Sequence, residues 1–292
     1  MKRTQRLEHI RWDLALRYRL IETVVWWEGR LTTKHLSQSF GISRQQASKD
    51  INTYINDYAS KNLVYDKQAK GYLPTRHFKP VFIDDSASAY LDLLNQNNER
   101  APHIEGLALA YAHTEVLTVP DRSVKPEILR PLLKACREKR RLDIEYVSFN
   151  SPELEGRTIA PHTLVYTGMR WHVRAYCEKN RKYRDFVLSR LRGIPELRDD
   201  ETDNGIDLDE EWNTLVDVIF KPDERLTTAQ RAIIEVDYGM TDGQLVVRRP
   251  QALVKYVVKR FQVNPNIHDP RPEAQQLVLA NRAELRPWLY ID

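Results

Sequence analysis

The sequence is poor in cysteine and glycine, and both shortages exclude whole classes of protein. Of its 292 residues only two are cysteines, Cys136 and Cys177, and no ligand spacing of cysteine or histidine surrounds them. A disulfide framework and a cysteine-based zinc module are therefore excluded, and a reducing compartment is expected. With ten glycines, the chain also lacks the glycine-rich phosphate loops, the Gly-x-Ser-x-Gly turn and the His-Glu-x-x-His zinc motif. The sequence predicts no metal, no cofactor and no enzymatic activity.

Long apolar runs are missing as well. No uncharged apolar run approaches the roughly 18 residues that a spanning helix requires. The basic start of the chain, MKRTQRLEHIRWD, is followed by no hydrophobic stretch. We therefore expect a cytoplasmic protein, neither secreted nor embedded in a membrane. At 292 residues and 41% apolar content, the chain is long and apolar enough for two or three folded domains.

Charge is distributed unevenly along the chain. Residues 1–80 hold 15 basic and 7 acidic side chains, and residues 122–198 hold 18 and 9. The two remaining blocks, which alternate with the basic ones along the chain, are acidic. Residues 81–121 hold 1 basic and 7 acidic side chains, and residues 199–292 hold 11 basic and 18 acidic side chains. Two basic blocks indicate two separate surfaces for polyanions, although solvated faces that arose by chance would give the same totals.

Composition also suggests the domain boundaries. Residues 196–211 carry nine acidic side chains and few large apolar ones, which predicts an exposed linker. Proline and aspartate interrupt the helical pattern near residues 77–85 and 120–126. We predict a first domain over 1–80, a helical connector over 81–120, a second domain over 121–198, an acidic linker over 199–211 and a third domain over 212–292.

The first domain has the pattern of a winged helix-turn-helix. Apolar residues, of which Leu7 is the first, recur at helical spacing and predict a long helix from about Thr4 to Trp27. Thr32 can cap a short helix ending at Phe40, Gly41 can supply a positive φ in the turn, and Ser43 can cap a helix over 44–58. The segments 63–66 and 71–74, joined by a basic tip, then predict a two-stranded wing.

The second helix of this pair has the chemistry of a recognition helix. Ala47, Ile51 and Ile55 form its buried stripe, and its outward side chains are types that contact bases and phosphates. The alternative is a plain three-helix bundle with a surface hairpin. The predicted DNA contacts are Thr33, Lys34, Ser43, Arg44, Gln45, Gln46, Ser48, Lys49, Lys67 and Lys70.

The second domain switches to the alternating pattern of strands. Segments 142–147, 158–166, 170–178 and 184–191 predict a small β-barrel after one helix. In the third strand, Trp171, Val173, Ala175 and Cys177 would face the core, and Arg170, His172, Arg174 and Tyr176 would form a cationic face. Such a face suits a nucleotide or oligonucleotide. Alternatively, these arginines pair with carboxylates of neighbouring strands such as Glu145 and Asp185.

The third domain is predicted as a small α+β unit. It would contain strands over 232–238, 244–248 and 276–280, and a helix from Pro250 to Phe261. It carries no reactive constellation, so we assign it to dimerisation or packing. Because it is acidic, it could also dock on a basic face.

The layout resembles the WYL-domain transcriptional regulators of bacteria. The matching residues are Pro161 to Leu164, the arginine-rich strand 170–177 and Arg184-x-Phe186-x-Leu188-x-Arg190; the tripeptide itself would fall on Trp171-His172-Val173, with only the tryptophan kept. The most similar type is the BrxR/CapW regulators, which sit beside phage-defence operons and repress them. The resemblance implies an α+β multidomain fold: an N-terminal winged helix-turn-helix, a central Sm-like barrel (WYL) and a C-terminal dimerisation domain.

The resemblance also implies a function. The protein would be a homodimeric repressor, associated with the nucleoid, that binds a double-stranded operator with inverted repeats. A nucleotide or single-stranded nucleic-acid effector on the barrel would control its affinity. The alternatives are a nucleic-acid-binding accessory protein and a nucleic-acid-processing enzyme. The candidate effector contacts are Tyr146, His162, Tyr166, Trp171, His172, Arg174, Arg184, Ser189 and Arg190.

Overall fold

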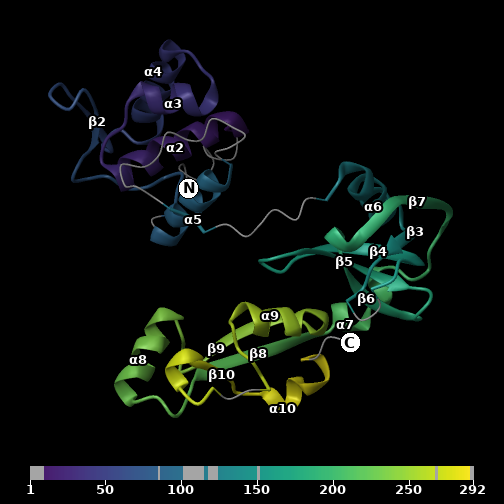
Figure 1. Cartoon of the computed structure of the whole chain (residues 1–292). Coiled ribbons are helices and arrows are strands. Elements are labelled where there is room, and N and C mark those ends of the chain that lie inside the picture. Colours follow the sequence, from purple (N-terminus) through teal and green to yellow (C-terminus); the bar gives the residue numbers. More distant parts are fainter. Residues whose placement is uncertain are drawn as a thin grey trace. The chain divides into compact units, whose positions relative to one another are not determined.

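The computed structural model describes residues 10–84, 86–100, 115–117, 124–149, 152–266 and 269–289. The chain divides into two compact units, Met1–Val119 and Pro120–Asp292, each considered by itself (Figure 1). Within the described ranges, no helix combines the length and the apolar character needed to cross a bilayer.

The first unit is a helical bundle with a hairpin beside it (Figure 1). Its elements are α2 (Trp12–Glu28), α3 (Thr33–Phe40), α4 (Arg44–Thr53), a π-helical turn (Tyr54–Tyr58), β1 (Leu63–Asp66), β2 (Gly71–Pro74) and α5 (Ala87–Arg100). The strands pair antiparallel, with Tyr65 opposite Tyr72. The part of the first predicted helix from Thr4 to His9, including Leu7, lies outside the described residues.

Local sequence signals fix the helix-turn-helix, as predicted. The backbone N–H of Thr32 donates to Nδ1 of His35, 3.0 Å away, which closes a capping box at the start of α3. Gly41 has φ +62°, a conformation that favours glycine, and turns the chain between the helices. The Oγ of Ser43 then accepts from the N–H of Gln46 and caps α4. Val25, Leu36 and Ile51 lie in one buried core.

The central domain of the second unit is a five-stranded antiparallel sheet beside one helix. Its elements are α6 (Pro126–Glu138), β3 (Arg140–Tyr146), β4 (Glu155–Tyr166), β5 (Trp171–Cys177), β6 (Lys182–Val187), a 3-10 turn (Leu188–Arg190) and β7 (Leu191–Glu201). The strand order is β6-β5-β4-β3-β7. Leu132 of α6 shares a core with Ile159, Val173 and Ala175. Bulges interrupt the β3–β7 and β4–β5 pairings.

The acidic stretch 196–211 is mostly exposed, as predicted, but its first part is a strand and not a linker. β7 continues to Glu201, which pairs with Arg140 on β3. Arg140 and Arg141 bind Asp199 and Asp200, at 2.8 and 2.6 Å. These arginines balance the acidic charge, so a strand forms where composition favours a loop. Further along, Asp209 is buried.

The C-terminal domain is a three-stranded sheet whose buried residues share one core with the helices of the domain. The chain enters it through a 3-10 turn (Ile206–Leu208) and α7 (Glu210–Asn213). Its elements are β8 (Leu215–Pro222), α8 (Thr228–Asp237), β9 (Leu245–Pro250), a 3-10 turn (Gln251–Leu253), α9 (Val254–Arg260), a 3-10 turn (Pro272–Ala274), β10 (Leu277–Leu279), α10 (Arg282–Leu285) and a last 3-10 turn (Arg286–Trp288). The strand order is β10-β8-β9.

Two predictions for this domain were wrong or incomplete. Residues 232–238 belong to helix α8 and its end, not to a strand, because Thr227 and Gln230 form a capping box that starts a helix there. Strand β8 was not predicted, although Val216, Val218, Ile219 and Phe220 are residue types that favour strands.

Candidate nucleic-acid interface and effector face

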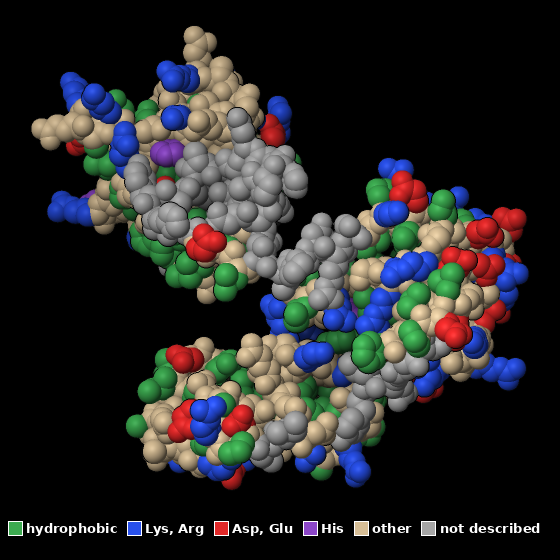
Figure 2. Space-filling view, in the orientation of Figure 1, with side chains coloured by type: hydrophobic (Ala, Val, Ile, Leu, Met, Phe, Trp, Pro, Cys, Tyr) green, Lys and Arg blue, Asp and Glu red, His purple; other side chains and the backbone are tan. Residues whose placement is uncertain are grey.

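The outer side of α4 and the wing together present a basic surface. Arg44, Gln45 and Lys49 are exposed on α4, and Lys67 and Lys70 are exposed on the wing tip. Figure 2 shows lysine and arginine side chains over α4 and over the wing. These side chains are free to meet base edges and phosphates.

The other predicted DNA contacts are less available. Gln46 is half-buried, and its amide donates to Oδ1 of Asp50 at 2.7 Å. Asp50 is itself buried and accepts from Arg17 of α2, also at 2.7 Å. Sequence spacing did not predict this ion pair, which fixes the rotation of α4 against α2. Ser43 uses its hydroxyl as the cap, Ser48 and Thr33 are half-buried, and Lys34 is exposed at the start of α3.

The wing is joined to the segment before α3. The N–H groups of Leu31 and Tyr72 each donate to the other's carbonyl at 2.8 Å. Arg30 donates to the carbonyl of Ala69 at 2.6 Å. Gly71 permits this approach, because a Cβ there would lie 2.8 Å from the Leu31 carbonyl oxygen. The position of the wing tip therefore depends on backbone contacts.

A buried carboxylate that the sequence did not reveal holds this domain together. Glu22 is fully buried in α2 and accepts hydrogen bonds from Tyr54 Oη at 2.7 Å and from the N–H groups of Val81, Phe82 and Ile83 at 2.7–3.1 Å. Asn62 extends this network from Tyr54 to Lys79. A glutamate among apolar residues of a helix carries no signal of such a role.

The predicted cationic face of β5 is covered by acidic residues. Arg174 is only 2% exposed. Its Nε and Nη2 donate to the two carboxylate oxygens of Asp209 at 2.7 and 3.0 Å, and Nη2 also donates to Glu211 at 2.8 Å. His162 Nε2 lies 3.2 Å from the same Asp209 carboxylate. The main partners of Arg174 therefore come from the acidic segment, and the expected cross-strand pair with Asp185 is longer, at 3.5 Å.

A second set of contacts links this face to the C-terminal domain. Asp185 on β6 accepts from Tyr256 Oη at 2.9 Å and from Lys255 Nζ at 3.0 Å, both on α9. The ring of Tyr256 also lies against His172, with centroids 5.1 Å apart. A Cβ at Gly168, in the β4–β5 turn, would collide with Arg260 of α9. The predicted cationic face of β5 and the C-terminal domain are thus in direct contact.

Burial and pairing shift the pKa values of these groups. Burial alone would raise the pKa of Asp209, but hydrogen bonds from His162 and Arg174 outweigh it and lower that pKa to about 2. Burial lowers the pKa of His172, which is therefore neutral at pH 7. Burial and the nearby Asp185 raise the pKa of Tyr256. Asp209 is accordingly a carboxylate at physiological pH.

The remaining effector candidates do not gather at one point. Trp171 was predicted to face the core, but it is the first residue of β5 and is 50% exposed. Its ring lies against that of Tyr166, with centroids 5.0 Å apart. Tyr146 is a core residue, and its Oη accepts from the N–H of Val187. Arg184 donates to Asn180.

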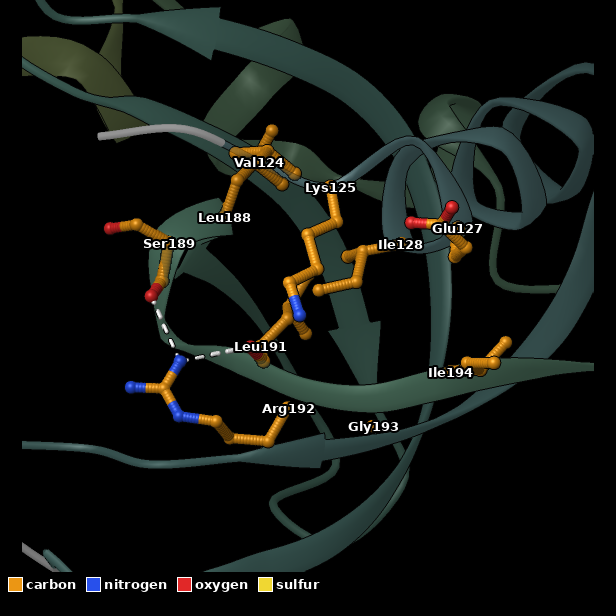
Figure 3. A pocket seen from close by; sticks show the side chains of 10 residues that line it. All are labelled: Val124, Lys125, Glu127, Ile128, Leu188, Ser189, Leu191, Arg192, Gly193 and Ile194. Carbon is orange, nitrogen blue, oxygen red and sulfur yellow. Dashed lines mark hydrogen bonds between the residues drawn. The ribbon is translucent and has the colours of Figure 1, made fainter. Parts of the chain in front are cut away.

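Ser189 lines a separate pocket of about 410 Å3 between the start of α6 and the start of β7 (Figure 3). Apolar Ile128 and Leu191 and basic Lys125 and Arg192 also line it. Arg192 donates to the carbonyls of Ser189 and Leu191, both at 3.0 Å. Arg190, the last candidate, is half-buried.

The winged helix, the central five-stranded sheet and the appended α+β domain define the class of protein: a DNA-binding transcriptional regulator of three domains. Family models match each part. The BrxR transcriptional regulator winged helix-turn-helix domain matches residues 13–96, the WYL domain matches residues 127–195, and the BrxR transcriptional regulator C-terminal dimerization domain matches residues 215–285.

Whole-chain relatives agree with these matches. The chain is 37% identical over 278 residues to the DNA-binding transcriptional repressor CapW of Pseudomonas aeruginosa, covering 94% of this chain and 92% of that one. It is 36% identical to CapW of Escherichia coli strain KTE188 (94% and 91% covered) and 31% identical to CapW of Stenotrophomonas maltophilia (97% and 94% covered). The chain belongs to the CapW family of WYL-domain transcriptional repressors.

Proposed function

We propose that this chain is a homodimeric transcriptional repressor of a phage-defence operon, whose operator affinity is set by a nucleotide or single-stranded nucleic-acid effector. The exposed Arg44, Gln45 and Lys49 on α4, beside the wing lysines, carry this proposal. In a dimer, two such helices read an operator of inverted repeats, with half-sites about one helical turn or a multiple of it apart. The effector acts by binding one conformation of the dimer more tightly than the other.

The proposal is tested by titrating the full chain, at two salt concentrations, with the duplex upstream of its own gene and with a scrambled duplex of equal length. A footprint of two symmetric half-sites and a large affinity gap over the scramble support it. Equal, steeply salt-dependent binding to both duplexes favours the accessory-protein alternative. Neighbouring genes of ordinary metabolism would contradict the phage-defence assignment.

Two substitutions separate base reading from phosphate binding. Arg44→Ala should cost about 1–3 kcal/mol of operator binding and relax the preference for one base pair, because a guanidinium pairs with a guanine edge in two places. Lys67→Ala should weaken operator and scramble alike and reduce the salt slope by about 1. Lys259→Ala, an exposed charge on α9, is the matched control. If neither α4 nor wing variant differs from that control, the assignment of this surface is wrong.

The dimer is proposed to form through the uncovered face of the C-terminal sheet. Val218 and Phe220 of β8 face the core with α8 and α9, so the alternate residues Leu215 and Ile219 face away. Val246 of β9 pairs with Ile219, and both Leu215 and Val246 are 52% exposed. The paired Asp217 and Arg248 lie between them on this face, and exposed apolar side chains rimmed by polar residues in this way mark a contact surface.

Val246→Glu should therefore raise the dimer dissociation constant at least tenfold, because a carboxylate would be desolvated in the contact. Light scattering across a dilution series measures this effect. Val236→Glu, on the exposed side of α8, provides the control. If Val236→Glu weakens the dimer and Val246→Glu does not, the dimer contact lies on α8 and not on the sheet.

A further inference from the structure

The guanidinium of Arg174 is already engaged as an effector phosphate would engage it. Two of its nitrogens face the two oxygens of the Asp209 carboxylate, at 2.7 and 3.0 Å. Arginine binds phosphate in the same two-point manner, because carboxylate and phosphate both offer a pair of oxygens to its planar fork. The Asp209 carboxylate thus stands where two phosphate oxygens would lie.

Other polar groups around Arg174 suit a phosphate once Asp209 withdraws. His162 Nε2 is 3.2 Å from the Asp209 carboxylate and could donate to a replacement oxygen. His172, on the same face of β5, is 6% exposed, and its Nδ1 has no hydrogen-bond partner among the described residues. A buried polar atom without a partner is costly, so a ligand that satisfies it gains affinity.

The competing carboxylates sit on the segment that joins the two domains. Asp209 accepts from the N–H of Trp212 and begins α7, and β8 of the C-terminal domain follows one residue after that helix. Glu211, the second carboxylate on Arg174, is 52% exposed at its side chain, so this side of the cluster reaches solvent. Withdrawal of Asp209 would therefore free the chain that leads directly into the dimerisation domain.

We infer that Asp209 is a built-in competitor for the effector: a ligand with a phosphate group binds Arg174 by displacing the Asp209 carboxylate, and this displacement releases α7. The inference rests on the proposed function and specifies how its effector site is regulated. Because the competitor belongs to the chain, its effective concentration is high. The effector consequently has to make more than one contact, and Arg174 and His162, which both contact Asp209, offer two.

The first experiment measures binding of inorganic pyrophosphate and of a 5′-phosphorylated dithymidine to the full chain by calorimetry. Asp209→Asn keeps a residue that can cap α7 but removes the competing charge, so we expect at least tenfold tighter binding of both probes. Asp207→Asn, an exposed acid two residues away, is the matched control and should change affinity less than twofold. An equal gain in probe affinity in both variants would overturn the inference, because the loss of any nearby negative charge would then explain the tighter binding.

A second variant guards against misfolding. Glu211→Gln removes an exposed carboxylate from the same guanidinium and leaves Asp209 and its cap in place, so a smaller gain of about two- to fivefold is expected. Adding Arg174→Met to either variant should abolish the gain. Unchanged probe affinity in folded Asp209→Asn and Glu211→Gln chains would refute the competition.

The release of α7 has its own measurement. In the unmodified chain, saturating dithymidine probe should speed amide hydrogen exchange in residues 209–213, and Asp209→Asn alone should do the same. No change in exchange at probe saturation would overturn the release. Operator titration distinguishes the two levels of the argument: a chain that binds the probes competitively but no operator contradicts the proposed function and leaves this inference standing.

Discussion

Replacing Glu22 with alanine should cost the winged-helix domain about 3 kcal/mol or more in its free energy of unfolding. The substitution leaves Tyr54 Oη and the N–H groups of Val81, Phe82 and Ile83 without their buried acceptor. Each buried donor that loses its partner costs about 1–3 kcal/mol, and domains of this size have only about 5–15 kcal/mol to lose. We expect the first thermal transition of the full chain to fall by many degrees.

Calorimetry and hydrogen exchange of α2 measure this effect. Glu22→Gln keeps one acceptor oxygen, so its free energy of unfolding should lie between those of Glu22→Ala and the unmodified chain. Asp92→Ala, an exposed acid on α5, should change stability by less than about 0.5 kcal/mol. If Glu22→Ala costs less than about 1 kcal/mol, the carboxylate does not hold the 81–83 segment against α2.

Replacing Arg174 with methionine should cost about 3–5 kcal/mol in the second unit, because it leaves the buried Asp209 carboxylate without its cation. The double variant Arg174→Met/Asp209→Leu removes both charges together and should recover most of the loss. The recovery should fall short by about 1 kcal/mol, since Asp209 also caps α7. In both variants Asp185 keeps its hydrogen bond with Tyr256 and its ion pair with Lys255.

Denaturant unfolding of the four chains of this cycle gives the coupling energy between the two residues. Arg181→Met, an exposed arginine near the β5–β6 turn, is the control and should be close to neutral. A double variant as unstable as Arg174→Met alone would mean that the cost comes from lost packing of the arginine stem and not from an unpaired charge.

Local signals explain what the sequence could predict. Thr32, Gly41 and Ser43 act on their own turns, so the helix-turn-helix follows from adjacent residues alone. The alternating patterns of β3 to β6 are likewise local. The same reasoning failed over 232–238, where Ile233, Ile234 and Val236 favour a strand but a capping box outside the segment starts a helix.

The candidate site depended on contacts that no local pattern contains. Asp209 is buried because Arg174, 35 residues earlier, pairs with it, whereas the composition around Asp209 indicates an exposed linker. Glu22 accepts from Tyr54, 32 residues away in sequence, and Asp50 accepts from Arg17, 33 residues away. The residue types on the cationic face of β5 were predictable from the sequence, but the acidic residues that cover this face, Asp209 and Glu211, were not.

The backbone connection between the wing and the start of α3 has a consequence for how operators can diverge within the family. Since Arg30 and the Leu31–Tyr72 pair fix the wing tip, the protein sets the interval between the base contacts proposed for α4 and the phosphate contacts proposed for Lys67 and Lys70. Substitutions on α4 can exchange the bases that are read while the footprint keeps its length. A change in that length requires an insertion or deletion in the hairpin itself.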